Sequence, residues 1–484
     1  MDPEARMRKQ SRRVIISEVI MVISVVLMVA ILALLVSGYW LNSDFTVERQ
    51  GMLQISSFPT GANVEVDGDA PWYQRTNTSK VLSSGEHSIK LVKDGYDTWS
   101  KTINVSEGLL YRLHYPRLFL NNRTKSDVYD LSGVIYATVS PNREKMLLAY
   151  GTTSWRLISL ENETITAKTI DVSRLFSTAD SSVFTDTIIS ADWDGSSEHI
   201  LFATKSGDAT KWVLLDTNTV ANSVNLTDIF STGYTRVDIL DNSANNLLAV
   251  QGQSLYRIDV GAKRISEPLL QNVIDYDHLG SEIAYVISKT VTPAEQIADP
   301  ATSGVADESI SPTTTTAYEI GTLRIGSDEP KVLSLSSKPA RILISRFYDE
   351  KYLTVVSESD VTVYYENDFS EMLSRQLSFV PNVVKVGHNG EFCTFISDEK
   401  IATLDMEAQD IREWNLDSVH FGWLDDDMIY AVAGGVLSVY DYDGLNRRTL
   451  AQNVSAKYPA TIASNNKWLY YVSDNTLVRE IVAD

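Results

Sequence analysis

The sequence predicts an all-β protein behind a single N-terminal hydrophobic helix. Two observations predict strands: short runs in which apolar and polar residues alternate, and the Gly, Asn, Asp and Pro residues that close these runs. A third observation is a unit of paired strands that recurs about every 40 residues from about residue 136 onward, which is typical of a repeat architecture. Helical spacing of apolar residues is scarcely seen beyond residue 41.

The first element is a predicted membrane anchor. Residues 19–36, from Val19 to Val36, read VIMVISVVLMVAILALLV and contain no charged residue. At about 1.5 Å per residue, residues 14–41 are long enough to cross about 30 Å of hydrocarbon, so we predict a transmembrane helix there. The alternative is a cleaved signal peptide, but its apolar core is usually about 7 to 15 residues long and this run is longer.

The flanking charges predict how the helix is oriented. Five of the first 13 residues are Lys or Arg, with Arg12 and Arg13 next to the apolar run. Basic residues stay on the cytoplasmic side of a membrane. We therefore expect a single-pass protein of the cell membrane, with residues 1–13 as a cytoplasmic basic tail and everything after residue 41 on the extracytoplasmic side.

Composition limits the partners and the chemistry. The chain has 63 acidic against 42 basic residues and a net charge of −21. Nucleic acid is not an expected partner, because phosphate binding needs a basic patch. Cys393 is the only cysteine, so no intrachain disulfide can form. It lies in the apolar run EFCTFIS, which predicts a buried, unreactive thiol.

Residues 50–116 read as a small antiparallel β-sandwich. Short alternating runs, such as NVEVDG and HSIKLVKDG, each end in turn residues. The residues predicted to share its core are Ile55, Val64, Val66, Ile89, Leu91 and Ile103.

These residues also carry a family resemblance. The run GMLQISSFPTGANVEVDG resembles the first hairpin of the PEGA domain, a β-module of envelope proteins, and SSGEHSIKLVKDGYDTW resembles its later strand and Gly-Tyr turn. The matching positions are Pro59, Gly61, Ala62, Val66, Asp67, Gly68, Gly85, His87, Gly95 and Tyr96, whereas Thr60 replaces the name-giving Glu. The resemblance implies a carbohydrate-binding or envelope-surface role. Trp72 and Tyr73 are the ligand-binding candidates, because aromatic rings stack on sugars, although they could equally pack onto the neighbouring domain.

Residues 117–484 read as a β-propeller. A short strand, a polar turn and a hydrophobic strand recur, and four short strands per unit of about 40 residues indicate propeller blades. The turns lie at Pro141, Asp194, Asp241, Leu279, Asp349, Asn389, Asp425 and Asn465. We count eight blades, with seven as the alternative because several units are divergent. The last unit has three evident strands, so RLFLNNR after Pro116, or a neighbouring segment, should supply the fourth and close the ring.

Two of these units resemble the WD40-like repeats of TolB and of prolyl oligopeptidase propellers. Ser140 and Pro141 match the Ser-Pro-Asp-Gly turn of those families, and Asp441, Asp443 and Gly444 match their Asp-x-Asp-Gly turn. Residues 289–317 interrupt one blade with Thr, Ala, Ser and Pro and few large apolar residues. Such a stretch predicts a disordered surface insertion, and the functional alternative is a lid or partner-binding arm.

Motifs for catalysis and for metals are missing from the sequence. There is no G-x-S-x-G elbow, Walker loop or H-E-x-x-H, and the six histidines are scattered singly. Calcium loops supply about five or more oxygen ligands at fixed offsets. Asp425, Asp426 and Asp427 fall short of that number, as do Asp441 and Asp443, the weak metal candidates. We therefore expect no catalytic residue, no metal and no cofactor.

The predicted function is a non-enzymatic binding or scaffolding role in the bacterial cell envelope, with a glycan or an exported protein as partner. One alternative is a hydrolase or lyase that uses the centre of the propeller, and another is a transmembrane sensor that acts through a partner. Convergence of Asp, Glu, His and Arg side chains from several blades on the channel would favour the enzyme, because catalysis needs positioned titratable groups.

Overall fold

The structure is a computed structural model of the 484-residue chain. It describes residues 18–33, 39–41, 47–71, 74–176, 184, 186–230, 233–240, 244–291, 315–327, 329–387, 389–416, 418 and 420–484. The chain divides into two compact units, Met1–Asn122 with Ala483, and Arg123–Val482 with Asp484. Strands make up most of the described secondary structure in both units, as the all-β prediction requires.

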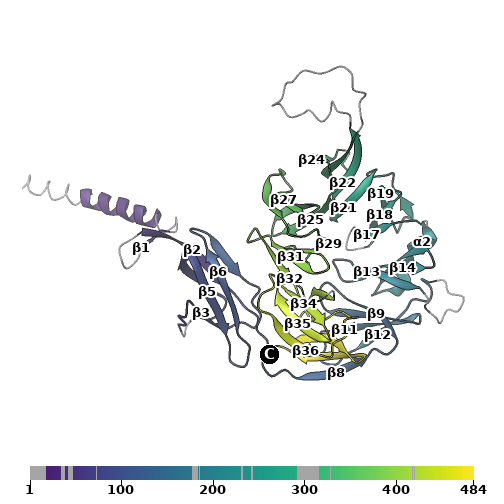
Figure 1. The fold of residues 1–484 in the computed structure, drawn as a ribbon, viewed down its shortest axis with the longest axis horizontal. Coiled ribbons are helices and arrows are strands. Elements are labelled where there is room, and N and C mark those ends of the chain that lie inside the picture. Colours follow the sequence, from purple (N-terminus) through teal and green to yellow (C-terminus); the bar gives the residue numbers. More distant parts are fainter. Residues whose placement is uncertain are drawn as a thin grey trace, which may run out of the picture. The chain divides into compact units, whose positions relative to one another are not determined.

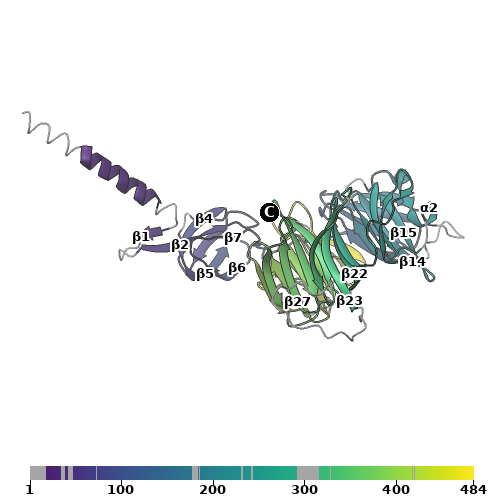
Figure 2. The same ribbon diagram turned by 90° about the horizontal axis from the view of Figure 1, so that it is seen from above.

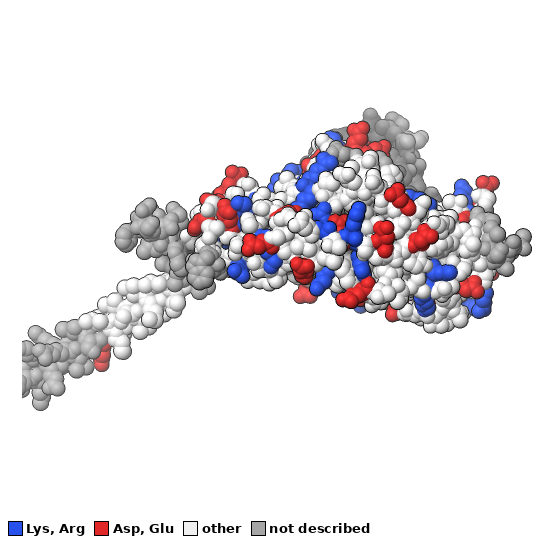
Figure 3. Space-filling view, turned by 90° about the horizontal axis from the view of Figure 1, so that it is seen from below, with Lys and Arg blue, Asp and Glu red and all other residues white. Residues whose placement is uncertain are grey.

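The N-terminal helix covers residues 18–33 and includes Val19. Its large apolar side chains are exposed, from 48% at Ile31 to 65% at Met28, and Figure 3 shows the helix with almost no charge along its length. Among the described helices, none combines the length and the apolar character that crossing a bilayer takes. Val36, Arg12 and Arg13 lie outside the described residues.

The predicted helical span was wrong at its C-terminal end. Residues 39–41 form a strand, β1 (Tyr39–Leu41), which pairs antiparallel with the start of β2 (Val47–Ile55). The reason is that β2 offers a free edge there, and Tyr and Trp favour strands over helices when such an edge is available.

The first unit continues as a sandwich of two sheets, whose layers Figure 2 shows. In one sheet, β2 pairs with β1, with β4 (Thr78–Ser83) and, in parallel, with β7 (Leu110–Leu113). The other sheet is formed by β3 (Asn63–Val66), β5 (Gly85–Val92) and β6 (Trp99–Val105). The predicted core is confirmed, because its six residues are at most 3% exposed: Ile55, Val64, Val66, Ile89, Leu91 and Ile103.

The second unit is built from four-stranded sheets, and Figure 1 shows them following one another around a common centre. The first is β9 (Val134–Val139), β10 (Lys145–Tyr150), β11 (Ser154–Ser159) and β12 (Ala167–Asp171). The second is β13 (Thr187–Trp193), β14 (His199–Ser206), β15 (Ala209–Asp216) and β16 (Val224–Asn225). The short helices η1 (Val220–Asn222) and α2 (Leu226–Ile229) flank β16. The third is β17 (Arg236–Ile239), β18 (Asn246–Gln251), β19 (Ser254–Asp259) and β20 (Arg264–Ile265).

The remaining sheets repeat this order. The fourth is β21 (Val273–Leu279), β22 (Glu282–Val291), β23 (Thr315–Arg324) and β24 (Lys331–Ser336). The fifth is β25 (Arg341–Phe347), β26 (Glu350–Ser357), β27 (Asp360–Tyr365) and β28 (Glu371–Gln376). The sixth is β29 (Val383–Val386), β30 (Phe392–Ile396), β31 (Lys400–Asp405) and β32 (Asp410–Asn415). The seventh is β33 (Phe421–Trp423), β34 (Met428–Ala433), β35 (Val436–Asp441) and β36 (Arg448–Gln452).

The last sheet joins the two ends of this unit. It consists of β37 (Thr461–Ile462), β38 (Trp468–Ser473), β39 (Thr476–Ile481) and β8 (Lys125–Asp130). The described residues of the unit thus form eight four-stranded sheets, where the sequence left seven or eight open. A segment next to RLFLNNR, rather than RLFLNNR itself, supplies the predicted closing strand. Arg123 fixes this end of the unit, with its Nε 2.6 Å from Glu480 Oε1.

One backbone turn recurs between the first and second strands of the sheets. A residue with positive φ stands in it at Arg143 (60°), Ser197 (59°), Ala244 (53°), Gly390 (75°) and Asn466 (62°). In the first sheet the Ser140 hydroxyl accepts a hydrogen bond from Lys145 N, and in the second the Asp194 carboxylate accepts from Glu198 N and His199 N. The turn is therefore conserved as a geometry while its residues vary, which explains why the repeats match the sequence motif so weakly.

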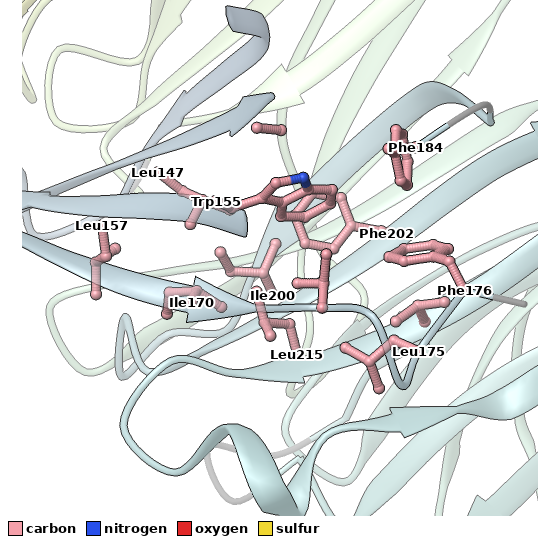
Figure 4. Close-up of a cluster of buried hydrophobic side chains, with 13 residues drawn as sticks. Leu147, Trp155, Leu157, Ile170, Leu175, Phe176, Phe184, Ile200, Phe202 and Leu215 are labelled. Carbon is pink, nitrogen blue, oxygen red and sulfur yellow. The ribbon is translucent and has the colours of Figure 1, made fainter. Parts of the chain in front are cut away.

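The sheets pack face to face through apolar clusters. Figure 4 shows the cluster between the first two sheets, where the Trp155 ring meets Phe202 and Phe184 edge-on, each at 5.3 Å between ring centroids. Cys393 lies in the cluster of the fifth and sixth sheets and is fully buried, as predicted. Burial raises the pKa of its thiol, which keeps the thiol protonated and inert.

The insertion in the fourth sheet is shorter than predicted at both ends. Residues 289–291 belong to β22 and residues 315–317 to β23, where they continue the ladder of paired strands as far as Val291 and Thr315. Backbone pairing across the hairpin extends the two strands although their side chains are polar. Residues 292–314 lie outside the described residues.

Candidate functional site

The first strands of the third, fourth and fifth sheets carry a network of charged side chains centred on Arg236. Its Nε lies 2.8 Å from Asp238 Oδ2, and its Nη1 donates to Tyr276 O at 2.7 Å and lies 3.4 Å from Asp275 Oδ1. The guanidinium also stacks over the Tyr276 ring at 4.1 Å, and the Tyr276 hydroxyl donates to Asp238. One arginine therefore links β17 to β21 through both charge and backbone.

Two aspartates of β21 bind the backbone of the next sheet. Asp275 Oδ2 accepts a hydrogen bond from Ile342 N at 3.0 Å, and Asp277 Oδ2 accepts one from Ile344 N at 2.9 Å. The spacing of two residues matches on both strands, because alternate residues of a strand face the same way. The first strand of each sheet pairs with one other strand. The backbone N–H groups on its unpaired edge therefore need hydrogen-bond acceptors from outside the sheet. Asp275 and Asp277 provide them.

The local pKa values follow from burial and from this charge pattern. Burial raises the pKa of Asp275, and burial with the nearby Asp238 charge raises the pKa of Asp192 on β13. For Arg236, burial alone would lower the pKa, but the surrounding Asp238, Tyr276 and Asp275 outweigh it and raise the pKa. Asp192, Arg236, Asp275 and Tyr276 border a cavity of about 1010 Å³. Titratable groups from several sheets thus converge on the channel, and most of them are engaged in joining neighbouring sheets.

A second cavity, of about 530 Å³, is lined by basic and aromatic side chains, and it shares Lys385 of the sixth sheet with the first cavity. Its polar lining differs from the acidic network, because cationic side chains outnumber carboxylates. The basic and aromatic residues lining it are Arg143, Lys385, His420, Lys457, Tyr136, Phe421, Trp423, Tyr430 and Tyr458. Gly422 leaves room for the Tyr430 ring in the lining of this cavity, because a Cβ at position 422 would come within 3.0 Å of that ring.

Most charges of the second cavity already have partners. Arg143 Nη2 lies 3.0 Å from Asp426 Oδ2, and Lys457 Nζ donates to Val134 O at 3.0 Å. Lys385 is exposed, and its amine makes no hydrogen bond or ion pair with any residue that the structure describes. Its side chain lines this cavity, the 1010 Å³ cavity and a third one of about 400 Å³. Lys385 is therefore the cation best placed to meet a ligand.

An aromatic wall stands beside Lys385. Trp423 lines both the 530 and the 400 Å³ cavities, and its ring stacks on Phe392 at 6.0 Å with an interplanar angle of 21°. Phe392 in turn stacks on Tyr442 at 4.2 Å. This stack holds the indole rigidly, so a planar ligand face meets a surface that does not need to be ordered on binding.

Of the predicted metal candidates, Asp425 lines the 530 Å³ cavity, whereas Asp441 and Asp443 line none of the three cavities. Trp72 and Tyr73 lie outside the described residues. Asp441 Oδ2 accepts from Asn446 Nδ2 at 2.8 Å, and Asp443 Oδ1 accepts from Leu445 N at 3.2 Å. Asp425 Oδ1 accepts from Asp427 N and Met428 N. These carboxylates close their own turns, as such residues commonly do.

Sequence reasoning missed Arg236, Asp275, Asp277, Lys385 and Trp423. The runs RVDI and VIDYDHL alternate charged and apolar residues, which predicts strands with one polar face but does not distinguish a face in solvent from one that lines a cavity. The first strand of a blade has one unpaired edge next to the central channel, where ionisable side chains can reach the backbone of a neighbouring blade, as Asp275 and Asp277 do. Sequence alone does not tell which blades face each other across it.

Comparisons with known proteins agree with the two units. The family model of the PEGA domain matches residues 50–116. No curated protein matches the sequence. Similar solved structures include the C-terminal WD40 domain of Sif2, at 10% identity and a TM-score of 0.47, covering 74% of this chain and 98% of that chain.

Two bacterial structures show similar levels of likeness. An oligogalacturonate lyase from Vibrio parahaemolyticus has 10% identity and a TM-score of 0.40, covering 72% of this chain and 96% of that chain. Dipeptidyl peptidase 4 of Porphyromonas gingivalis has 10% identity and a TM-score of 0.45, covering 71% of this chain and 56% of that chain. At such identities the likeness concerns fold alone. Residues 50–116 are a PEGA domain, and the strand order of the second unit is that of a β-propeller.

Proposed function

We propose that this chain is a membrane-anchored, non-enzymatic binding protein of the bacterial cell envelope, and that its propeller channel recognises a glycan or a segment of an exported protein. The apolar run of residues 19–36 and the five basic residues before it support membrane anchoring with the two β-units outside. The PEGA domain supports an envelope location, since the family resemblance implies one.

The observation that carries this proposal is the arrangement around Lys385. The Lys385 amine makes no hydrogen bond or ion pair with any described residue, and it lines the same cavity of about 530 Å³ as the Trp423 ring, which stacks on Phe392. Ligand sites are concave, with aromatic walls and a few polar groups that fix orientation. A sugar ring or a peptide side chain can stack on the indole, while a polar or anionic group of the same ligand reaches the amine.

The hydrogen bonds of the acidic network favour binding over catalysis. A general acid or base must reach the reacting group, within about 3 Å or through one water. Asp275 and Asp277 instead accept backbone hydrogen bonds from β25, and Asp238 accepts from Arg236 and Tyr276. Asp192, whose pKa burial raises, is the group on which the rival hydrolase or lyase would depend.

A binding screen with matched variants tests the proposal. The full chain in detergent would be screened on a glycan array and against exported proteins, and then repeated as Lys385→Met and Trp423→Leu. We expect either substitution to weaken binding by about tenfold or more, which corresponds to about 1.4 kcal/mol. Lys331→Met, on the exposed outer strand β24, is the control and should bind as the unmodified chain does.

Two results would contradict the proposal. Unchanged binding by Lys385→Met would remove the channel as the site. Turnover of a ligand by the purified chain, lost in Asp192→Asn, would instead establish the enzyme.

A further inference from the structure

The outward face of the first PEGA sheet carries an exposed apolar row. Met52 on β2 is the direct cross-strand partner of Val81 on β4 and of Leu110 on β7. These three side chains are 44%, 48% and 44% exposed, and Leu109, just before β7, is 62% exposed. Large apolar side chains scattered singly on a surface are normal, but four contiguous ones mark an interaction surface.

The positions around this row differ in charge from the rest of the chain, which is strongly acidic. The outward-facing positions of β2 from Gln50, of β4 and of β7 are Gln50, Met52, Gln54, Ser79, Val81, Ser83, Leu110 and Arg112. No carboxylate occurs among these eight positions, and Arg112 is their one charged residue, in a chain with a net charge of −21. The acidic residues nearest in sequence are Glu48, two residues before Gln50 on β2, and Glu107, two residues before Leu109. The face therefore suits contact with a layered surface whose interior is apolar and whose outer layer is anionic.

The chain connects this face directly to the N-terminal helix. Along one edge of β2, β1 pairs with Val47–Arg49, the turn around Leu109 bonds to Gln50 and Met52, and β7 pairs from Met52 onward. Met52 is three residues along β2, or about 10 Å, from Arg49, and Arg49 pairs with Tyr39. Tyr39 in turn follows the apolar helix, residues 18–33, by six positions. Leu109, the most exposed of these four apolar residues, is at the end of the sheet where the chain arrives from the helix.

We propose that this face of the PEGA domain, formed by Met52, Val81, Leu109 and Leu110, rests on the lipid surface into which the N-terminal helix inserts. The proposal rests on the membrane anchoring proposed above. The apolar side chains enter the boundary between headgroups and acyl chains, and Arg112 meets anionic headgroups, as in other interfacial segments. Contact with lipid would fix the orientation of the PEGA domain relative to the membrane.

A site-specific label on the full chain tests this contact. Cys393 is fully buried, so Val81→Cys can be labelled selectively with an environment-sensitive fluorophore. The labelled chain would be reconstituted in vesicles of phosphatidylcholine and phosphatidylglycerol containing a spin-labelled lipid quencher. Thr102→Cys, exposed on β6 of the opposite sheet, is the matched control. We expect quenching at position 81 to be several-fold stronger than at position 102.

A second variant separates lipid contact from misfolding. Met52→Gln combined with Leu110→Gln changes the outward face and leaves the buried residues Leu53 and Ile55 intact. We expect the pair to abolish preferential quenching at position 81 while vesicle flotation and the melting temperature stay unchanged.

Three outcomes would overturn the inference. Equal quenching at positions 81 and 102 in a chain that floats with the vesicles would remove this face from the lipid, while the proposed anchoring would stand. Energy transfer between labels at position 81 that persists in detergent would assign the face to a second copy of the chain. Failure of the full chain to float with vesicles in high salt would overturn the anchoring itself.

Discussion

At the residue scale, single polar side chains join sheets that hydrophobic packing only places side by side. Asp277 accepts hydrogen bonds from Ile344 N, on the next sheet, and from His278 N, both at 2.9 Å. A buried backbone N–H without an acceptor costs about as much as a lost hydrogen bond. The aspartates of β21 therefore stabilise the channel wall although burial raises their pKa values.

Replacing Asp277 should destabilise the propeller. Asp277→Ala removes the side-chain acceptor of two partly buried N–H groups, so we expect the free energy of unfolding to fall by about 1 to 3 kcal/mol. Asp277→Asn keeps one side-chain acceptor and should lose less. Urea unfolding followed by tryptophan fluorescence measures the change, with the exposed Asp208→Ala as control. An Asp277→Ala chain as stable as the control would show that the hydrogen bond from Ile344 N of β25 to Asp277 does not contribute to stability.

His87 in the PEGA domain should make that unit sensitive to pH. Its Nδ1 lies 2.7 Å from Asp67 Oδ2; burial alone would lower the pKa of His87, but the hydrogen bonds to Asp67 and Ser83 outweigh it and raise the pKa. The stabilisation is thus fully present below about pH 6.5 and is lost as pH rises through the folded pKa. Because half of the Asp67 side chain is exposed, we expect less than about 1 kcal/mol.

The measurement is the melting temperature of the PEGA unit between about pH 5.5 and 8.5. His87→Gln should flatten the dependence, whereas His420→Gln, in the other unit, should leave it unchanged. A melting temperature of the PEGA unit that rises with pH would contradict the assigned direction.

At the element scale, the closing sheet has a different origin from the others. Its first three strands come from the end of the chain, and β8 comes from the start of the propeller unit. The register runs from Thr476 opposite Asp130 to Glu480 opposite Lys125. Glu480 stands at the end of this pairing, 5% exposed, and accepts from Arg123 Nε and from the Tyr471 hydroxyl at 3.1 Å. The junction depends on a buried polar contact as well as on the ladder.

Removing the Glu480 carboxylate should loosen this junction. Glu480→Ala removes the acceptor of Arg123 Nε and of the Tyr471 hydroxyl, and breaking a buried pair in this way costs about 3 kcal/mol. Hydrogen exchange of the amides from Ser126 to Tyr129 should accelerate more than that of β26, whose side chains pack in clusters that contain no residue of the closing sheet. Glu480→Gln retains a carbonyl acceptor and should show an intermediate effect. Uniform acceleration across all sheets would indicate global destabilisation instead of local opening.

At the scale of the whole molecule, the proposed anchoring predicts how proteases reach the chain. With residues 1–13 on the cytoplasmic side, protease added to the outer face of the membrane should digest the PEGA and propeller units. The charge pattern before the apolar run causes this orientation, so Arg12→Glu combined with Arg13→Glu should give a mixed orientation. Western blotting of intact and permeabilised spheroplasts measures the protected fraction. Protection of both units in intact spheroplasts would reverse the proposed topology.

The sequence by itself determined the class of the fold and the order of its parts. Alternation within short strands predicted the buried Ile55, Val64 and Ile89, because side chains of a strand point alternately to the two faces. The recurring turns predicted the blades, and the missing fourth strand of the last unit predicted closure near Pro116. Each of these signals is local, since it depends on neighbouring residues along the chain.

Only the tertiary structure decided which side chains meet across the channel. Arg236, Asp275 and Ile342 come from three different blades, and Lys385 and Trp423 from two others, so no spacing in the sequence relates them. The same reason explains the errors at element ends. Tyr39–Leu41 became a strand because β2 offers a free edge, and β22 and β23 extended because each pairs with the other. Such pairing energies arise between segments brought together by folding, and they are absent from either segment alone.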